Sequence, residues 1–323
     1  MTSTKSKVFI TGITGMVGSH MADFLLDKTE VVGLKRWRSP MDNVRQLEGK
    51  VKFVDGDLKD QACLIKILNK EKPDIIYHFA AQSYVPISYT MPAETLQDNI
   101  LGTLNLLEAI CLLGIDPLVI IASSSEVYGQ VTNEDVPIKE TCHFRPVSPY
   151  AVSKVAEDML AYQYFKAYGK KIIRTRLFTH TGPRRWWTFV ESLFAYQIAL
   201  VEKGKQSCIY NHGNEESLKS VRTWLDVRDA VKAYWLLRTC TPGDVYNIGG
   251  DKTMTVEDML HFLIANSTIK NIELVHDGKW LRPADVTLQI PDSNKFRKES
   301  GWLPEIPFET TMLDLLNYWR ERV

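Results

Sequence analysis

The sequence predicts an α/β protein built on a doubly wound parallel sheet, with a smaller C-terminal α/β part. Three observations support this prediction. Short apolar, β-branched runs alternate with longer helical patterns in the first half of the chain, which is typical of strand–helix–strand units. A glycine-rich turn follows the first of these runs. The chain has 323 residues, which is enough for one large domain and a smaller unit.

The expected elements follow one another in a regular order. Strand-like runs cover residues 8–11, 30–34, 51–54, 74–79, 118–122 and 171–178, and helical patterns cover 18–27, 61–69, 95–113 and 149–167. The strands are apolar throughout because helices should cover both faces of the sheet. We expect a first domain over residues 1–178 and a mainly substrate-binding part over 179–323. Residues 221–250, which include a further strand-like run, are expected to pack back on the first domain.

Composition excludes several classes of function. The formal net charge is zero, so we expect no nucleic-acid partner. No run of about 18 apolar residues and no signal-peptide pattern occurs, so no membrane association is expected. The five cysteines are scattered without a Cys-x-x-Cys pair, which favours reduced thiols, a cytoplasmic location and no metal site.

The glycine-rich turn carries the first chemical signal. Gly12, Gly15 and Gly18 form Gly-x-x-Gly-x-x-Gly between a strand and a helix. This spacing gives a tight turn, a close approach to a pyrophosphate, and close packing of helix on strand. The helix start then directs free N–H groups and a positive dipole end at the phosphates. The pattern predicts a Rossmann-type dinucleotide site.

The end of the second strand indicates which dinucleotide binds. An acidic residue there would bind the ribose 2′-hydroxyl of NAD, whereas cations suit the 2′-phosphate of NADP. This chain has Lys35, Arg36 and Arg38 at that point and no carboxylate. We therefore expect NADP(H) rather than NAD, with Arg36 on the phosphate. Asp57, after the third strand, is either an adenine ligand or simply a turn former.

A Tyr-x-x-x-Lys pair indicates the reaction centre. Pro149 suits the first turn of a helix, so Tyr150 and Lys154 lie on one helix face at i and i+4. A free phenol has a pKa too high for a base near neutral pH, and a nearby ammonium favours the phenolate and lowers that pKa. Ser124 and Glu126 follow a strand, at the edge where doubly wound sheets bind ligands. Ser124 can share a proton with Tyr150, and Glu126 can act as a general base.

These motifs are similar to those of extended short-chain dehydrogenases/reductases, and within them to the GDP-mannose 4,6-dehydratases and the related GDP-4-keto-6-deoxy-mannose reductases. The dehydratases carry Ser-Thr-Ser-Glu-Leu-Tyr-Gly, His-Leu-Ala-Ala-Gln-Ser, Lys-Arg-Arg, Ser-Pro-Arg-Arg followed by Phe-Val, and Arg-Pro-x-Glu-Val. The corresponding segments here are residues 123–129, 78–83, 35–38, 182–185 with 189–190, and 282–286. The resemblance covers nearly the whole chain. One departure is Thr179, which replaces an asparagine that commonly touches substrate.

The resemblance implies a lyase that recycles its cofactor. Tyr150 would deprotonate the sugar 4-hydroxyl while NADP⁺ takes the C4 hydride, and Glu126 would then remove the C5 proton and help expel the C6 hydroxyl. Return of the hydride to C6 gives a 4-keto-6-deoxy sugar. The implied catalytic residues are Ser124, Glu126, Tyr150 and Lys154. The implied cofactor contacts are Gly12, Thr14, Gly15, Met16, Val17, Gly18, Arg36, Asp57, Leu58, Ala80, Ala81, Gln82, Tyr150 and Lys154. The implied substrate contacts are Ser83, Ser125, Thr179, Arg184, Arg185, Arg222 and Arg282.

Other functions remain open at this point. The leading hypothesis is a 4,6-dehydratase acting on a GDP-sugar such as GDP-mannose. The same Tyr150 and Lys154 pair also suits an NADP(H)-dependent nucleotide-sugar 4-reductase or dehydrogenase, or a UDP-sugar 4-epimerase or decarboxylase. A non-catalytic NADP sensor is a further alternative, although it would need no phenolate base. Relatives commonly pair through the helices near 95–113 and 149–167, so a homodimer or homotetramer is expected.

Overall fold

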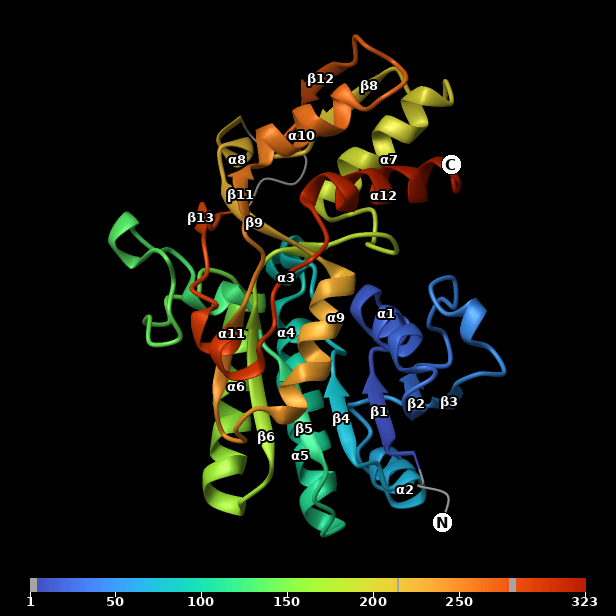
Figure 1. Cartoon of the computed structure of the whole chain (residues 1–323), viewed down its shortest axis with the longest axis vertical. Coiled ribbons are helices and arrows are strands. Elements are labelled where there is room, and N and C mark those ends of the chain that lie inside the picture. The colour runs from blue at the N-terminus through green and yellow to red at the C-terminus, as the bar shows by residue number, and fades with distance from the viewer. Residues whose placement is uncertain (1–4, 214, 279–282) are drawn as a thin grey trace.

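The computed structural model describes residues 5–213, 215–278 and 283–323. Within these residues, seven parallel strands form one sheet in the order β10-β6-β5-β4-β1-β2-β3 (Figure 1). They are β1 (Lys7–Thr11), β2 (Glu30–Lys35), β3 (Lys52–Asp55), β4 (Ile75–His78), β5 (Leu118–Ala122), β6 (Ile172–Leu177) and β10 (Val245–Ile248). The order reverses between β1 and β4. The predicted doubly wound sheet is confirmed, and its switch point lies where such sheets bind ligands.

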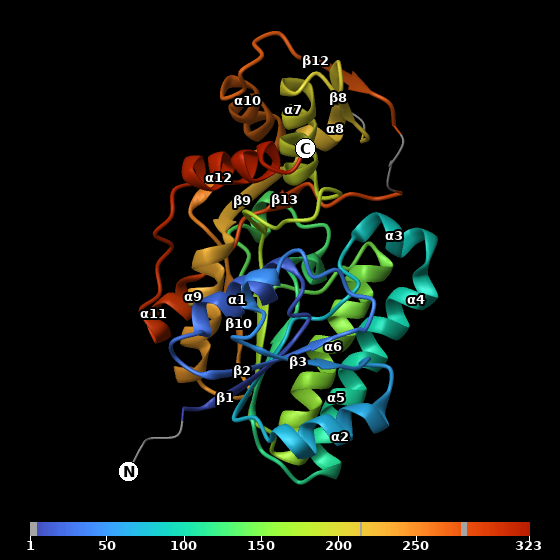
Figure 2. The ribbon, with the colours of Figure 1, turned by 90° about the vertical axis from the view of Figure 1, so that its right-hand side faces the viewer.

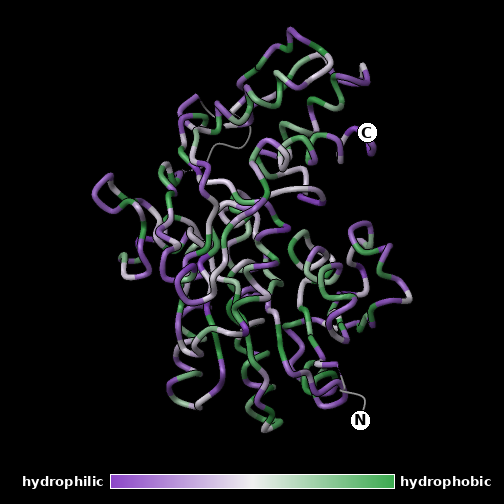
Figure 3. The backbone as a smooth tube through the Cα atoms, in the orientation of Figure 1, coloured by the Kyte–Doolittle hydropathy of each residue, from purple (hydrophilic) through white to green (hydrophobic). Residues whose placement is uncertain are grey.

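Helices cover both faces of this sheet. The helices are α1 (Met16–Leu25), α2 (Gln61–Glu71), α5 (Gly102–Leu112), α6 (Pro149–Tyr168) and α9 (Val227–Leu236). Helices α2, α5 and α6 pack on one face, whereas α1 and α9 pack on the other (Figure 2). The apolar strand residues are therefore enclosed between two layers, and the most polar segments lie at the periphery (Figure 3).

The helical pattern at 95–113 differs from the prediction. The structure has α3 (Val85–Thr90), α4 (Pro92–Leu96), a π-helical turn η2 (Gln97–Leu101) and then α5. Pro92 begins α4 because proline suits the first helical turn. The π-turn, a feature often found at functional sites, places the Asn99 amide against Gln82 and Ser153. The single expected helix is thus interrupted at a buried polar contact.

The C-terminal part adds a second core. Its larger helices are α7 (Val190–Glu202), α10 (Val256–Ala265) and α12 (Phe308–Arg320), which pack together. Strand β9 (Val221–Asp226) pairs with β11 (Lys252–Thr255), β13 (Leu288–Gln289) and β7 (His180–Thr181), and β8 (Cys208–Asn211) pairs with β12 (Glu273–His276). The short helix α8 (Glu215–Leu218) also belongs to this part, whereas α11 (Asn294–Ser300) packs on β10 of the main sheet, where its Phe296 is buried.

The two parts of the chain are interleaved. Strand β10 returns to the main sheet beside β6, and α9 packs on α1. Segments between residues 227 and 248 therefore belong spatially to the main sheet and the helices that cover it. The unit of α7, α10 and α12 lies at the carboxyl ends of the strands (Figure 1). In the part of the chain that the structure describes, no helix is long and apolar enough to cross a membrane.

Candidate active site

The loop between β1 and α1 leaves room for a phosphate group. Gly12 has φ +71°, and a Cβ on it would lie 2.8 Å from the backbone nitrogen of Ala80. A Cβ on Gly18 would lie 2.3 Å from the Gly12 carbonyl oxygen, so both positions exclude side chains. Gly15 is the N-cap of α1 and offers no capping side chain. The first N–H groups of α1 are therefore left for a ligand.

A cavity of about 750 Å³ runs from this loop to the C-terminal part. Its wall contains most of the residues predicted from the sequence, which come from many separate segments. They are Gly12, Thr14, Gly15, Met16, Val17, Gly18, Arg36, Asp57, Leu58, Ala80, Ala81, Gln82, Ser83, Ser124, Ser125, Glu126, Tyr150, Lys154, Thr179, Arg185 and Arg222. The volume is in the range of ligand sites, and this glycine-lined, cation-bearing wall fits a phosphorylated dinucleotide.

The cations after β2 have different surroundings. The Lys35 ammonium lies 2.5 Å from Asp55 Oδ1, and the Arg38 guanidinium lies 5.2 Å from the Trp37 ring centroid. Arg36 lines the cavity, and its guanidinium has no hydrogen-bond or ion-pair partner among residues 5–213, 215–278 and 283–323. Its backbone N–H donates to Ser39 Oγ, and Ser39 also lines the cavity. Of these three cations, Arg36 is thus the one whose charged group is left for a ligand in the cavity.

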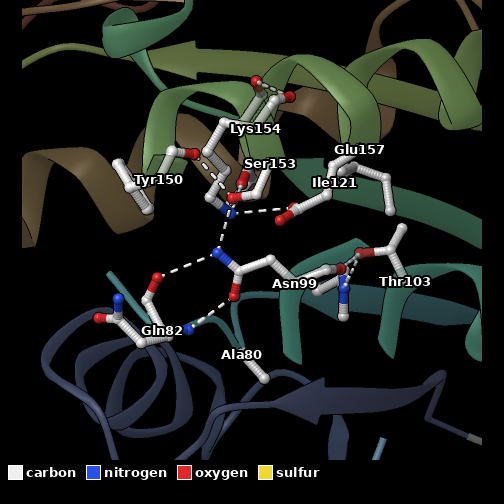
Figure 4. A network of polar contacts seen from close by, with 12 residues as sticks. Ala80, Gln82, Asn99, Thr103, Ile121, Tyr150, Ser153, Lys154 and Glu157 are labelled. Carbon is white, nitrogen blue, oxygen red and sulfur yellow. Dashed lines mark hydrogen bonds and ion pairs between the residues drawn. The ribbon is translucent and has the colours of Figure 1, made fainter. Parts of the chain in front are cut away.

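The first turn of α6 carries the Tyr-x-x-x-Lys pair. Ser148 caps this helix by accepting from the Ala151 N–H at 3.0 Å, and Pro149 follows as the first helical residue. Tyr150 and Lys154 are buried on the face toward the cavity (Figure 4). The Lys154 ammonium donates to the Ala122 carbonyl at 2.9 Å.

Burial raises the pKa of the Tyr150 phenol, whereas the Lys154 ammonium and a hydrogen bond from Ser124 lower it. These opposing effects are those expected of a phenol that must ionise during a reaction. Ser124 also accepts from the Glu126 N–H at 3.2 Å. The short helix η3 (Ser125–Tyr128) therefore begins directly at the Ser124 side chain and places Glu126 on the same wall.

A buried polar network behind Tyr150 was missed by the sequence reasoning. The Asn99 amide donates to Gln82 O at 3.0 Å and to Ser153 Oγ at 2.8 Å, and Ser153 donates to the Tyr150 carbonyl (Figure 4). Asn99 Oδ1 accepts from the Gln82 N–H at 2.7 Å. The network joins β4, η2 and α6 and fixes the start of α6. The available signal was the polar run Gln97-Asp98-Asn99 inside the helical pattern.

His78 belongs to the same interior. Its ring nitrogens contact Thr11 Oγ1 at 2.8 Å and Thr103 Oγ1 at 2.9 Å. Burial lowers the pKa of His78 to about 3, and the Lys154 ammonium lowers it further. The ring is neutral at physiological pH and connects β1, β4 and α5. It therefore holds these elements together and carries no charge into the site.

The predicted arginines are arranged differently from one another. Arg185 lines the cavity, with its guanidinium 3.1 Å from Glu191 Oε1 and 3.5 Å from the Phe189 ring centroid. Arg222 also lines the cavity and donates to the Val286 carbonyl. Arg184 has φ +71° and lies 2.5 Å from Asp23 on α1, outside the cavity wall. Arg282 lies outside the described residues.

Glu126 has a partner that sequence reasoning also missed. Gln289, at the end of β13, donates its amide to Glu126 Oε1 at 2.9 Å, and its own Oε1 accepts from the Thr179 hydroxyl at 3.4 Å. Gln289 and Thr179 both line the cavity. The available signal was a polar residue between two apolar ones, Leu288 and Ile290.

Comparisons with known proteins agree with this geometry. A family model described as GDP-mannose 4,6 dehydratase matches residues 9–315. The GDP-mannose 4,6-dehydratase of Vibrio cholerae serotype O1 is 32% identical, over 97% of this chain and 93% of that protein. The GDP-6-deoxy-D-mannose reductase of Pseudomonas aeruginosa is 31% identical, over 98% of each chain.

Solved structures share the whole fold. A structure of RMD from Pseudomonas aeruginosa complexed with NADPH has a TM-score of 0.84 and 31% identity, over 98% of this chain and 100% of that one. A dTDP-glucose 4,6-dehydratase from Streptomyces venezuelae with NAD bound has a TM-score of 0.87 and 25% identity, over 98% of this chain and 97% of that one. The chain therefore shares its whole fold with enzymes solved in complex with nicotinamide dinucleotides.

Proposed function

Because the chain belongs to the GDP-mannose 4,6-dehydratase family, we propose that it converts a GDP-sugar such as GDP-mannose to the 4-keto-6-deoxy sugar with loss of water. The observation that carries this proposal is the convergence of Ser124, Glu126, Tyr150 and Lys154 on one cavity wall. A phenol and a carboxylate on the same wall supply the two bases that oxidation and elimination require.

We propose NADP(H) as the cofactor. The N–H groups at the start of α1 would face its pyrophosphate, Arg36 and Ser39 its 2′-phosphate, and Lys154 the ribose beside the nicotinamide. Asp57, Leu58, Ala80, Ala81 and Gln82, which line the same wall, would contact the adenosine and the nicotinamide half. The bound cofactor would accept a hydride from C4 and later donate it to C6, so that none is consumed.

The residues of this chain would then move protons in a defined order. Tyr150 takes the proton of the 4-hydroxyl as the C4 ketone forms, with Ser124 hydrogen-bonded to the same oxygen. The ketone acidifies the C5 proton, which Glu126 removes. The C5–C6 double bond forms, the C6–O bond breaks, and Glu126 passes its proton to the leaving hydroxyl to give water. C5 must regain one proton when the hydride returns to C6, and Tyr150 holds one extra proton from the 4-hydroxyl. The protons therefore balance, and the protein returns to its starting state.

We propose that Arg185 and Arg222 bind the substrate diphosphate, because a diphosphate in a partly buried cleft requires cations. Ser83, Ser125 and Thr179 line the same wall and are proposed to contact the sugar. Arg184 is ion-paired to Asp23 and is left out of this proposal, whereas a role for Arg282 stays a prediction. Residues 179–323 would thus supply most of the substrate contacts, and residues 1–178 most of the cofactor contacts.

We also propose a homo-oligomer built on the helices α5 and α6. These helices pack side by side, and large apolar side chains remain exposed on and beside them. The exposed residues are Leu101, Leu112, Val152, Met159 and Tyr162. Several exposed apolar side chains on two helices that pack side by side are typical of a protein interface. The cytoplasmic location expected from the five cysteines stays a prediction.

The proposed reaction is tested with purified protein and GDP-mannose, without added cofactor. The product is followed by mass and by the ultraviolet absorbance of 4-keto sugars in alkali. Loss of one water with no net change in NADPH supports the dehydratase. The P. aeruginosa reductase, nearly as similar in sequence, makes a 4-reductase the second candidate. Turnover of a 4-keto sugar that consumes stoichiometric NADPH, without water loss from GDP-mannose, would replace the dehydratase by that reductase.

A further inference from the structure

Gln289 occupies a fixed position opposite Glu126. Its strand, β13, pairs with β9, and Gln289 stands in register with Arg222. On its other side, the Ile138 N–H donates to the Ile290 carbonyl at 2.8 Å, and the Asp292 N–H donates to the Ile138 carbonyl at 2.8 Å. The backbone around Gln289 is therefore held by hydrogen bonds from two directions, and the residue is 3% exposed.

The contacts of the side chain define its orientation. Glu126 Oε1 is 2.9 Å from the Gln289 amide nitrogen. A carboxylate only accepts hydrogen bonds, so the NH₂ end must face Glu126. The opposite end, Oε1, then accepts from the Thr179 hydroxyl at 3.4 Å. Glu126 Oε2 has no hydrogen-bond partner in the described segments, so it is left for the substrate side of the cavity.

We propose that Gln289 is a positioning residue, which holds one oxygen of Glu126 so that the other meets the C5 proton of the substrate. This inference rests on the proposed dehydration. The Gln289–Glu126 hydrogen bond joins the C-terminal part, which supplies β13, to the short helix η3, which follows β5 and carries Glu126. This hydrogen bond connects the part of the cavity that would hold the sugar to Glu126, the base that would act on it. It also holds Glu126 in place before the reaction begins.

A neutral amide suits this role better than a cation or a carboxylate. An ammonium or guanidinium at 2.9 Å would form an ion pair and make Glu126 a weaker base. A carboxylate would repel Glu126 from its place. The amide donates one hydrogen bond and adds no charge, so it orients the Glu126 carboxylate without forming an ion pair with it.

The test compares three variants in a stopped-flow turnover experiment with GDP-mannose. Gln289→Met keeps the length of the side chain but cannot donate. Gln289→Glu keeps both shape and polarity but presents an acceptor to Glu126. Gln130→Met is the matched control, because the exposed Gln130 amide also binds the C-terminal segment, at the Asp285 carbonyl, without touching Glu126. Water loss, KM, and the absorbance of enzyme-bound NADPH at about 340 nm are recorded for each.

Both Gln289 variants should lower kcat for water loss by about 10- to 100-fold, the range expected when a hydrogen bond to a charged group is lost, with KM nearly unchanged. Because C4 oxidation does not use Glu126, bound NADPH should accumulate during turnover in both. Gln130→Met should match the wild type. A purely structural role would predict that water loss and C4 oxidation fall together, so that no bound NADPH accumulates in the Gln289 variants, and that result overturns the inference.

The outcomes for the wild type separate this inference from the proposed function. A wild type that removes no water from any nucleotide sugar rejects the dehydratase and the inference together. A wild type that dehydrates, with a Gln289→Met variant of equal kcat, rejects the inference alone. A folding defect in Gln289→Met would appear as a lower melting temperature, and the isosteric Gln289→Glu variant then decides.

Discussion

The Lys154 ammonium lies 2.9 Å from Glu157 Oε2, and the two side chains are 5% and 1% exposed. The pair occupies the same face of α6 at i and i+3, directly behind Tyr150 (Figure 4). Glu157 Oε1 is buried and has no hydrogen-bond partner among the described residues. Burial raises the pKa of Glu157 to about 7, although the Lys154 ammonium lowers it. The Lys154 ammonium, whose charge the reaction needs, is thus paired with a carboxyl whose pKa is about 7.

This pair predicts a pH-dependent stability. The folded pKa of Glu157, about 7, is above its ordinary value of 4.5, so the native state binds more protons than the unfolded state between these values. The free energy of unfolding should therefore fall as pH rises from about 4.5 to 7, by up to about 3 kcal/mol from this group. Glu157→Gln lacks the effect. Urea unfolding of both proteins at several pH values checks this, and parallel stability curves would contradict it.

Replacing Tyr150 by Phe should abolish the first chemical step. The phenol is buried beside Lys154 and Ser124, and loss of a general base typically costs about 10²- to 10⁴-fold in rate. With GDP-mannose, Tyr150→Phe should give neither water loss nor a transient of bound NADPH, while NADP⁺ binding by fluorescence titration stays near the wild-type value. Tyr168→Phe, at the exposed end of α6, is the control. Full activity in Tyr150→Phe would sink the proposed mechanism.

Replacing Glu126 by Gln should separate oxidation from elimination. Glu126 is proposed only for the C5 proton, so Glu126→Gln should lower water loss by about 10²- to 10⁴-fold and still permit C4 oxidation. Bound NADPH should then build up toward one per active site in a single-turnover experiment. Glu134→Gln, on an exposed turn, should leave both signals unchanged. An unaltered rate of water loss in Glu126→Gln would show that another group removes the proton.

The sequence predicted those strands and turns whose formation depends on residues close to one another in the chain. Each apolar run became a strand within one or two residues. For the inner strands the reason is that their pattern requires burial on both faces, whereas β3 lies at the edge of the sheet and is only partly buried. The glycines of the first loop followed from backbone sterics, since a Cβ at Gly12 or Gly18 would collide with backbone atoms. Such constraints act within a few residues or between neighbouring strands, and a single sequence contains them.

Features that depend on distant segments could not be predicted. Arg184 and Arg185 are adjacent and identical, yet the left-handed backbone at Arg184 turns it toward Asp23, whereas Arg185 faces the cavity. Glu126 and Gln289 are separated by 163 positions, and their contact depends on the pairing of β13 with β9. A residue type and its spacing do not determine which of two arginines points inward or which strand a late segment joins.

Removing the cation at Arg36 should weaken NADP⁺ binding selectively. Arg36 lines the cavity, whereas Arg38 stacks on the exposed Trp37 ring. A charge-assisted hydrogen bond to phosphate is worth about 1.5–3 kcal/mol, so Arg36→Ala should raise the Kd for NADP⁺ by about 10- to 100-fold. The Kd for NAD⁺, which has no 2′-phosphate, should change little, and Arg38→Ala should leave both constants near wild type. Equal loss of both cofactors in Arg36→Ala would mean that Arg36 does not contact the 2′-phosphate.

A charge on the exposed face of α6 should separate the subunits of the proposed oligomer. Val152, Met159 and Tyr162 lie on one stripe of α6, at spacings of seven and three residues, and Leu112 is exposed on the neighbouring α5. Burying a methionine side chain contributes about 1.5–3 kcal/mol, and a buried carboxylate without a partner costs more. Met159→Glu should therefore raise the dissociation constant of the oligomer at least about 10-fold in sedimentation experiments. Leu303→Glu, which replaces an apolar residue that is 59% exposed beyond α11, should leave the oligomer intact. If Met159→Glu also leaves it intact, the subunits do not associate through α6, because a carboxylate at the centre of a closed apolar interface would have no water and no cation to contact.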